Sequence, residues 1–63
     1  MKKYYCVSTT IFDNGNILSS ICSSKFAEER PKSTMEVSTK EDRYYDWFSS
    51  IDDAEEFIEI TKR

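Results

Sequence analysis

The stretch KYYCVSTTIFDNGNILSSICSSKF, from Lys3 to Phe26, decides the fold of this 63-residue chain. Its two arms are rich in β-branched and aromatic residues, which favour strands, and the residues 13–16 separate them. Asn14-Gly15 between such arms is typical of a hairpin turn, because glycine readily takes the positive φ that the turn needs and asparagine tolerates it. We therefore expect an antiparallel hairpin with strands over about 3–12 and 17–27.

The pattern leaves the pairing register of this hairpin open. A two-residue turn would pair Phe12 with Ile17, whereas a type I turn followed by a glycine bulge would pair Ile11 with Ile17 and Cys6 with Cys22. In both registers each face of the hairpin carries large apolar side chains. One packed layer can cover only one of these faces, so the other is expected to lie open.

The C-terminal stretch YYDWFSSIDDAEEFIEI predicts a third strand over about 42–49 and a helix over about 51–62. Ser50 followed three positions later by Asp53 is typical of a helix N-terminus. Helical periodicity places an apolar face opposite an acidic one, and we expect Phe48 and Phe57 in the core. The apolar face would hold Ile51, Ala54, Phe57, Ile58 and Thr61, and the acidic face would hold Asp52, Glu55, Glu56 and Glu59. The positive charges of Lys62 and Arg63 in the last turn would be favourable at the negative end of the helix dipole.

Between these elements the segment 28–40 is polar and charged and contains the only proline, Pro31. We expect it to be a mobile connection, with a possible extended piece where Met35 and Val37 alternate with polar residues. The predicted fold is thus a single α+β domain, 1–63. It consists of a small antiparallel three-stranded sheet, the N-terminal hairpin plus a third strand, with one C-terminal helix packed on one face.

The composition argues against catalysis, metals and cofactors. The chain has no histidine and one glycine, so neither a histidine-assisted nucleophile nor a glycine-rich phosphate loop can be built. Cys6 and Cys22 are sixteen positions apart and match no zinc spacing, and we read them as reduced strand residues. The start of the chain lacks the apolar run of a secretory signal, so we expect a cytoplasmic protein with no membrane span, no cofactor and no enzymatic activity.

A chain this short buries only about 60 % of its unfolded surface and commonly relies on a partner for further burial. The surplus aromatic and apolar residues predict an interaction surface made of Tyr4, Phe12, Ile21, Tyr44, Tyr45 and Trp47. We expect a non-enzymatic protein-interaction module, either a homodimer formed through the second sheet face or an edge strand, or a binder of another protein.

The alternative is a single-stranded nucleic-acid binder. Tyr4, Tyr44 and Trp47 would then stack on bases beside Lys2, Lys3 and Lys25. The net charge of −3 and the position of Asp46 between two aromatics oppose this reading.

Three motifs, MKKYY, DNG and DWFSSIDDAEEF, resemble short uncharacterised bacterial and prophage proteins over about half of the chain. That resemblance brings no assigned activity; with the short acidic character of the chain, it suggests a regulator or inhibitor of a host protein. A second resemblance, through KKYY and FSSIDDAEEF, is to the RNA·DNA hybrid-binding domain at the N-terminus of some ribonucleases H. The glycine-rich and lysine-rich middle of that domain is missing here, so no binding residues are carried over.

Overall fold

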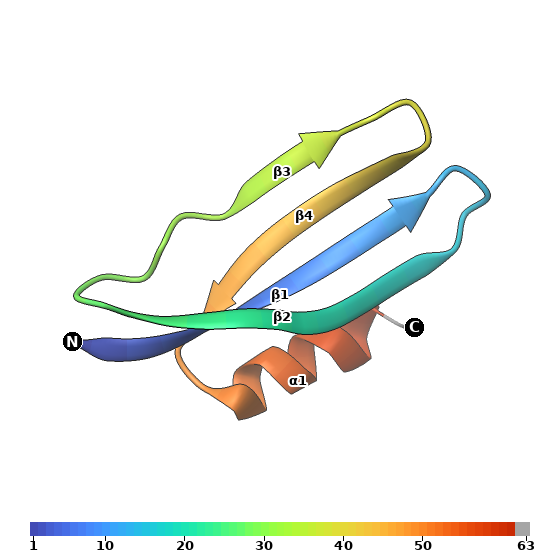
Figure 1. Cartoon of the computed structure of the whole chain (residues 1–63). Helices are drawn as coiled ribbons and strands as arrows, with labels where there is room; N and C mark the ends of the chain where they lie inside the picture. The colour runs from blue at the N-terminus through green and yellow to red at the C-terminus, as the bar shows by residue number, and fades with distance from the viewer. Residues whose placement is uncertain (62–63) are drawn as a thin grey trace.

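A computed structural model describes residues 1–61, which form four strands and one helix (Figure 1). All neighbouring strands are antiparallel, and their order in the sheet is β2-β1-β4-β3. The N-terminal strand is therefore central, and the hairpin partner β2 lies at one edge. The elements are β1 (Lys2–Phe12), β2 (Ile17–Ala27), β3 (Thr34–Val37), β4 (Glu41–Phe48) and α1 (Ile51–Thr61).

The turn between β1 and β2 adopts the glycine-bulge register. Ile11 pairs with Ile17, the Gly15 N–H donates to the Phe12 carbonyl at 3.0 Å, and the Phe12 N–H donates to the Asn16 carbonyl at 2.9 Å. Gly15 has φ +90°, a left-handed conformation that a side chain would strain. The single glycine of the chain thus sets the register of the longest strand pair.

A second bulge interrupts the same strand pair further from the turn. Val7 pairs with Ile21 but Cys6 pairs with Ser23, so Cys22 is the extra residue of β2. The pairing of β1 with β4 runs through this point without a shift. The glycine-bulge register at the turn is confirmed. The pairing of Cys6 with Cys22, which was expected from that register, is wrong because the second bulge shifts the strands.

The sheet has four strands rather than the three expected. Thr34–Val37, within the segment expected to be a mobile connection, pairs with β4 from Thr34 opposite Tyr45 to Val37 opposite Asp42. The tight loop 38–40 follows this segment and brings β4 back alongside it, which allows the two strands to pair. Within the loop, the Ser38 hydroxyl accepts from the Glu41 N–H at 3.1 Å. The broader prediction of an α+β fold with an antiparallel sheet and a C-terminal helix is confirmed.

The helix begins where the sequence indicated. The Ser50 hydroxyl accepts from the Asp53 N–H at 3.1 Å, which satisfies one of the free donors of the first turn. Asp52 and Asp53 lie at the positive end of the helix dipole. The predicted extension of the helix to 62, and the roles expected of Lys62 and Arg63, fall outside the described residues.

The helix packs on one face of the sheet against β1, β2 and β4. Ala54 and Val7 are fully buried, and the rings of Phe48 and Phe57 lie 5.1 Å apart between the sheet and the helix. The two phenylalanines, which were expected in the core, are in contact but only half-buried. On the predicted apolar face of the helix, Ile51 is the exception, because it is 45 % exposed.

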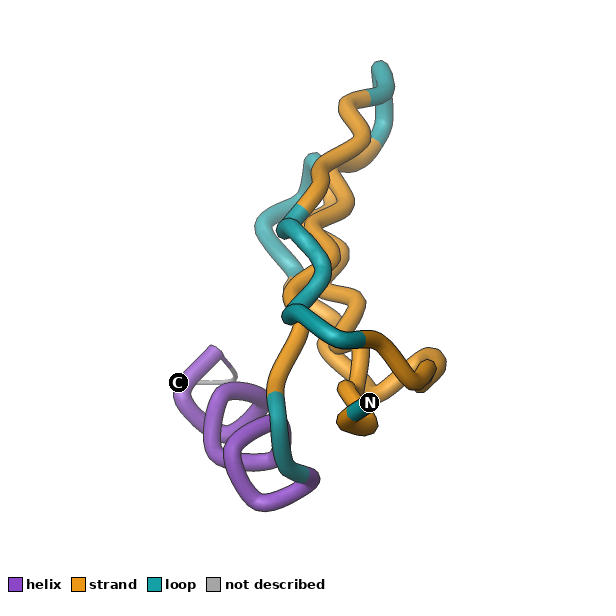
Figure 2. Tube along the Cα trace, turned by 90° about the vertical axis from the view of Figure 1, so that its left-hand side faces the viewer, coloured by secondary structure: helices purple, strands orange, loops and turns teal. Residues whose placement is uncertain are grey.

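The sheet is longer than the helix that covers it. Viewed from the side, α1 lies on one side of the sheet and the strands extend well past it (Figure 2). The radius of gyration is 12.2 Å, compared with about 11 Å expected for a compact chain of this length. The far end carries both hairpin turns, which are joined by a hydrogen bond from the Asp13 N–H to the Lys40 carbonyl at 3.1 Å.

Candidate interaction surfaces

The pairing registers assign every strand residue to one of two sheet faces, since directly opposed residues share a face and neighbours along a strand alternate. Phe48 contacts the helix, so Tyr5, which is directly opposite Phe48, is on the helix side. Val7 is two residues further along β1 and is therefore on the same side. We call the opposite side the open face. It carries Tyr4, Cys6, Thr10 and Phe12 from β1, Leu18, Ser20 and Lys25 from β2, and Arg43, Tyr45 and Trp47 from β4.

The six residues predicted as an interaction surface do not form one surface. Tyr4, Phe12, Tyr45 and Trp47 lie on the open face, whereas Ile21 and Tyr44 lie on the helix side. Tyr4 is only 7 % exposed, while Tyr45 and Trp47 are half-buried and Phe12 is 36 % exposed. The structure thus brings together four of the six, of which three are accessible.

Lysines lie over aromatic rings on both faces. On the open face, Lys25 Nζ is 5.3 Å from the centre of the Trp47 ring, close enough for a cation–π interaction. On the helix side, Lys3 Nζ is 5.6 Å from the Tyr5 ring and 5.8 Å from the Phe26 ring. Lys3 and Tyr5 are two residues apart on β1, whereas the contacts of Lys3 with Phe26 and of Lys25 with Trp47 join different strands and could not be found without the register.

Asp46 does not point toward the open face. It pairs with Val7 and is therefore on the helix side, where its carboxylate accepts from the Ser33 hydroxyl at 2.9 Å. The negative charge that the sequence places between Tyr45 and Trp47 is thus directed away from both rings. The open face around Trp47 is more basic than the linear sequence indicated.

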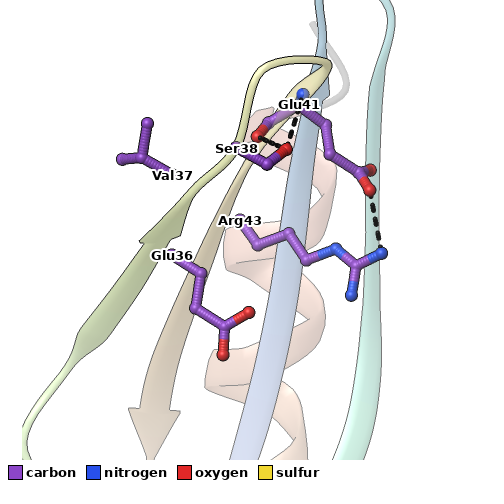
Figure 3. A pocket seen from close by; sticks show the side chains of 5 residues that line it. All are labelled: Glu36, Val37, Ser38, Glu41 and Arg43. Carbon is purple, nitrogen blue, oxygen red and sulfur yellow. Dashed lines mark hydrogen bonds and ion pairs between the residues drawn. The ribbon is translucent and has the colours of Figure 1, made fainter.

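A shallow hollow of about 240 Å³ lies at the β3–β4 hairpin (Figure 3). Arg43 donates to the Glu41 carboxylate at 2.9 Å, and hydrogen bonds with Glu41 and Tyr45 raise the pKa of its guanidinium. The Ser38 hydroxyl donates to the Glu41 carbonyl at 2.8 Å, while Glu36 pairs across the strands with Arg43. These contacts stabilise the tight turn. The polar groups of Ser38, Glu41 and Arg43 are therefore occupied by hydrogen bonds within the hairpin.

The two cysteines do not form a disulfide. Cys6 is buried and Cys22 is exposed, and the Cys22 thiol donates to the Cys6 carbonyl at 3.5 Å. Burial, reinforced by the neighbouring Cys22, raises the pKa of the Cys6 thiol to about 11. A thiol that stays protonated at neutral pH is a poor nucleophile, so its surroundings do not activate Cys6.

The outer face of α1 is acidic and exposed. Glu55, Glu56 and Glu59 are exposed, and with Asp52 and Ile58 they line an open depression. Within residues 1–61, no group of three or more acidic, cysteine or histidine side chains is arranged to hold a metal ion. The acidic face is therefore a solvated helix surface in the described part of the chain.

The two edges of the sheet differ sharply. β3 has four residues, contains Glu36 and follows Pro31 and Lys32, which are features that discourage further strand pairing. β2 has eleven residues, and its first half, Ile17–Ile21, carries no charge and no proline. Sequence reasoning missed this edge because it could not assign the strand order, although the uncharged run ILSSI was a visible signal.

Among the described residues, no helix is both long and apolar enough to cross a membrane. Comparison with protein families, with curated proteins and with solved structures finds no match to this chain.

Proposed function

We propose that this chain is a non-enzymatic protein-interaction module that binds by adding a strand to the β2 edge. The observation that carries the proposal is the length and composition of that edge, since long uncharged edge strands offer a row of free backbone donors and acceptors. Ile17, Leu18 and Ile21 on this segment are 47 %, 60 % and 38 % exposed. They would supply side-chain contacts beside the backbone hydrogen bonds.

The polar groups that the structure places together serve the fold. Cys6 is held protonated, and the ion pair of Arg43 and Glu41 serves the β3–β4 turn. A partner strand would also bury apolar area that this small domain leaves exposed at the free end of its sheet. Such binding would allow the chain to regulate or inhibit a host protein.

The test is an NMR titration of the ¹⁵N-labelled chain with linear peptides selected for binding from a random library. We expect chemical shift changes and slower amide exchange at Ile17 and Ile21, with the Trp47 indole unaffected. Peptides that instead perturb Trp47 and Tyr45 and leave β2 unchanged would contradict binding at the edge.

A second candidate function is binding of single-stranded nucleic acid on the open face. It is favoured by Lys25 over the Trp47 ring and by the orientation of Asp46 toward the other face. Against it, Tyr4 is buried and Tyr44 is on the helix side, so the expected three-ring platform is not assembled.

Titration with oligo(dT) at low and high salt separates this candidate from the first. Stacking predicts a change in Trp47 fluorescence that weakens as salt rises, and a Trp47→Phe variant removes the signal while a gel-shift assay still reports binding. No change in either assay at low salt would remove the nucleic-acid candidate.

A further inference from the structure

We propose that Cys6 and Cys22 form a site of reversible thiol–disulfide exchange, at which a low-molecular-weight disulfide oxidises the two thiols to an intramolecular disulfide. The site lies at the second bulge of the β1–β2 hairpin. It is outside the segment Ile17–Ile21, so the inference goes beyond the proposed function and does not depend on it.

The bulge turns the Cys22 side chain toward the open face. In a regular strand, the side chains of Cys22 and Ser23 would point to opposite faces of the sheet. Instead, Cys22 Sγ lies 3.9 Å from Ser23 Oγ. Ser23 is directly opposite Cys6 and shares its face, so all three side chains meet on the open face.

The same bulge brings the two cysteines within the reach of a disulfide. Two residues of a bulged strand oppose one residue of its partner, here Cys22 and Ser23 opposite Cys6. Opposed Cα atoms of antiparallel strands are about 4.5–5.5 Å apart, and a disulfide requires about 4.4–6.8 Å. The Cys22 thiol already donates to the Cys6 carbonyl at 3.5 Å. Bond formation therefore needs rotation of the side chains and no change of strand register.

The acid–base behaviour of Cys6 agrees with this cluster. Burial raises the pKa of its thiol to about 11, and the adjacent Cys22 adds to the rise because two neighbouring thiolates repel each other. A hydrogen bond with the Ser23 side chain acts in the opposite direction and lowers the pKa. Cys6 therefore has both bulge residues as neighbours.

The exposure of the two cysteines assigns their roles. Cys22 is exposed, whereas Cys6 is buried. The helix lies on the other side of the sheet and does not cover this site (Figure 2). Beside Cys6, the side chain of Lys25 crosses β1 to reach the ring of Trp47. A small disulfide can thus reach Cys22 from solvent, and Cys6 completes the exchange from within the sheet.

The exchange has two balanced steps. The Cys22 thiolate attacks one sulfur of the small disulfide, whose S–S bond breaks, so one reagent thiol leaves and a mixed disulfide forms at Cys22. Cys6 then loses its proton to water and attacks the Cys22 sulfur, which releases the second reagent thiol. Two protein thiols are oxidised while the reagent disulfide is reduced to two thiols, and an excess of reagent thiol reverses both steps.

The experiment equilibrates the chain, at low protein concentration, with mixtures of reduced and oxidised glutathione. Acid quenching and mass spectrometry then separate the dithiol, the mixed disulfide and the intramolecular disulfide, and their ratios give the effective concentration of the thiol pair. The same measurement in urea reports the unfolded chain. The matched control is the double variant Cys22→Ser with Ser24→Cys, because Ser24 is equally exposed but pairs with Tyr5 on the helix side.

We expect an effective concentration at least about tenfold higher in the folded chain than in urea, because a flexible loop holds two groups at only about millimolar effective concentration. The double variant should stop at the mixed disulfide on its relocated thiol, and far-UV circular dichroism checks that it keeps the fold. Equal effective concentrations with and without urea would overturn the inference. A mixed disulfide or a disulfide-linked dimer as the main product of the folded natural chain would also overturn it.

Discussion

The two ends of the sheet consist of continuous strands, yet they are stabilised in different ways. At the covered end, α1 buries Val7 and Ala54 completely and brings the Phe48 and Phe57 rings to 5.1 Å. At the free end, Leu18 and Val37 are 60 % and 71 % exposed, each hairpin turn has its own backbone hydrogen bonds, and one further backbone hydrogen bond joins the two turns. Hydrophobic burial therefore stabilises one end, while the other keeps its shape by turn geometry and remains available to a partner.

The strongest test of this contrast is Phe57→Ala. Loss of a half-buried ring from the helix–sheet contact should lower the free energy of unfolding by about 2–3 kcal/mol. The matched change at the free end, Val37→Ala, should cost less than about 0.5 kcal/mol because the side chain is exposed. Urea denaturation measures both, at one fixed protein concentration because self-association raises apparent stability. Comparable losses would show that the free end is also held by burial.

The second test concerns the buried thiol of the covered end. The pKa of Cys6 is about 11 in the folded chain and about 9 when unfolded, so between these values only the unfolded state releases the proton. Stability should be unaffected below pH 9 and should fall as the pH rises toward 11, by up to about 2 kcal/mol. Urea denaturation at pH 8 and pH 10.5 measures the change. A Cys6→Ala variant should lose less, and an equal loss would assign the effect to other groups.

The covered end was the more predictable one because its signals are local. Ser50 and Asp53 mark the helix start within four residues, and the 3.6-residue period places Phe57 toward the sheet. The Asn-Gly turn was equally visible, but two registers were compatible with it. The hydrogen bonds of Gly15 and Phe12 decide between them.

The missed features depend on contacts between distant segments. β3 is four residues long and is a strand only because β4 lies beside it, so the alternation of Met35 and Val37 was too short to predict it. The bulge at Cys22 and the edge position of β2 likewise follow from how β1 pairs with both neighbours. Because the face of each aromatic depends on these registers, the predicted six-residue surface was divided between two faces.

The third test asks whether the turn holds the free end. Gly15→Ala should cost about 1–2 kcal/mol, because a residue with a side chain is strained at φ +90°. An added Cβ would meet no atom within 4 Å, so the cost belongs to the backbone alone. Gly15→Asn is the control and should cost less, since asparagine tolerates this conformation. Thermal unfolding of both variants measures the difference, and equal costs would point to a steric cause.

The smallest effect is expected where the covered end begins, at the helix cap. Ser50→Ala removes the acceptor of the Asp53 N–H and should lower stability by about 1 kcal/mol, whereas Ser50→Asp should restore most of it. Ser49→Ala, one residue earlier and exposed, is the control and should change stability by less than about 0.5 kcal/mol. Urea denaturation gives all three values. If the cap variant also leaves β2 amide exchange unchanged, the covered end can loosen without altering the edge that we propose as the binding surface.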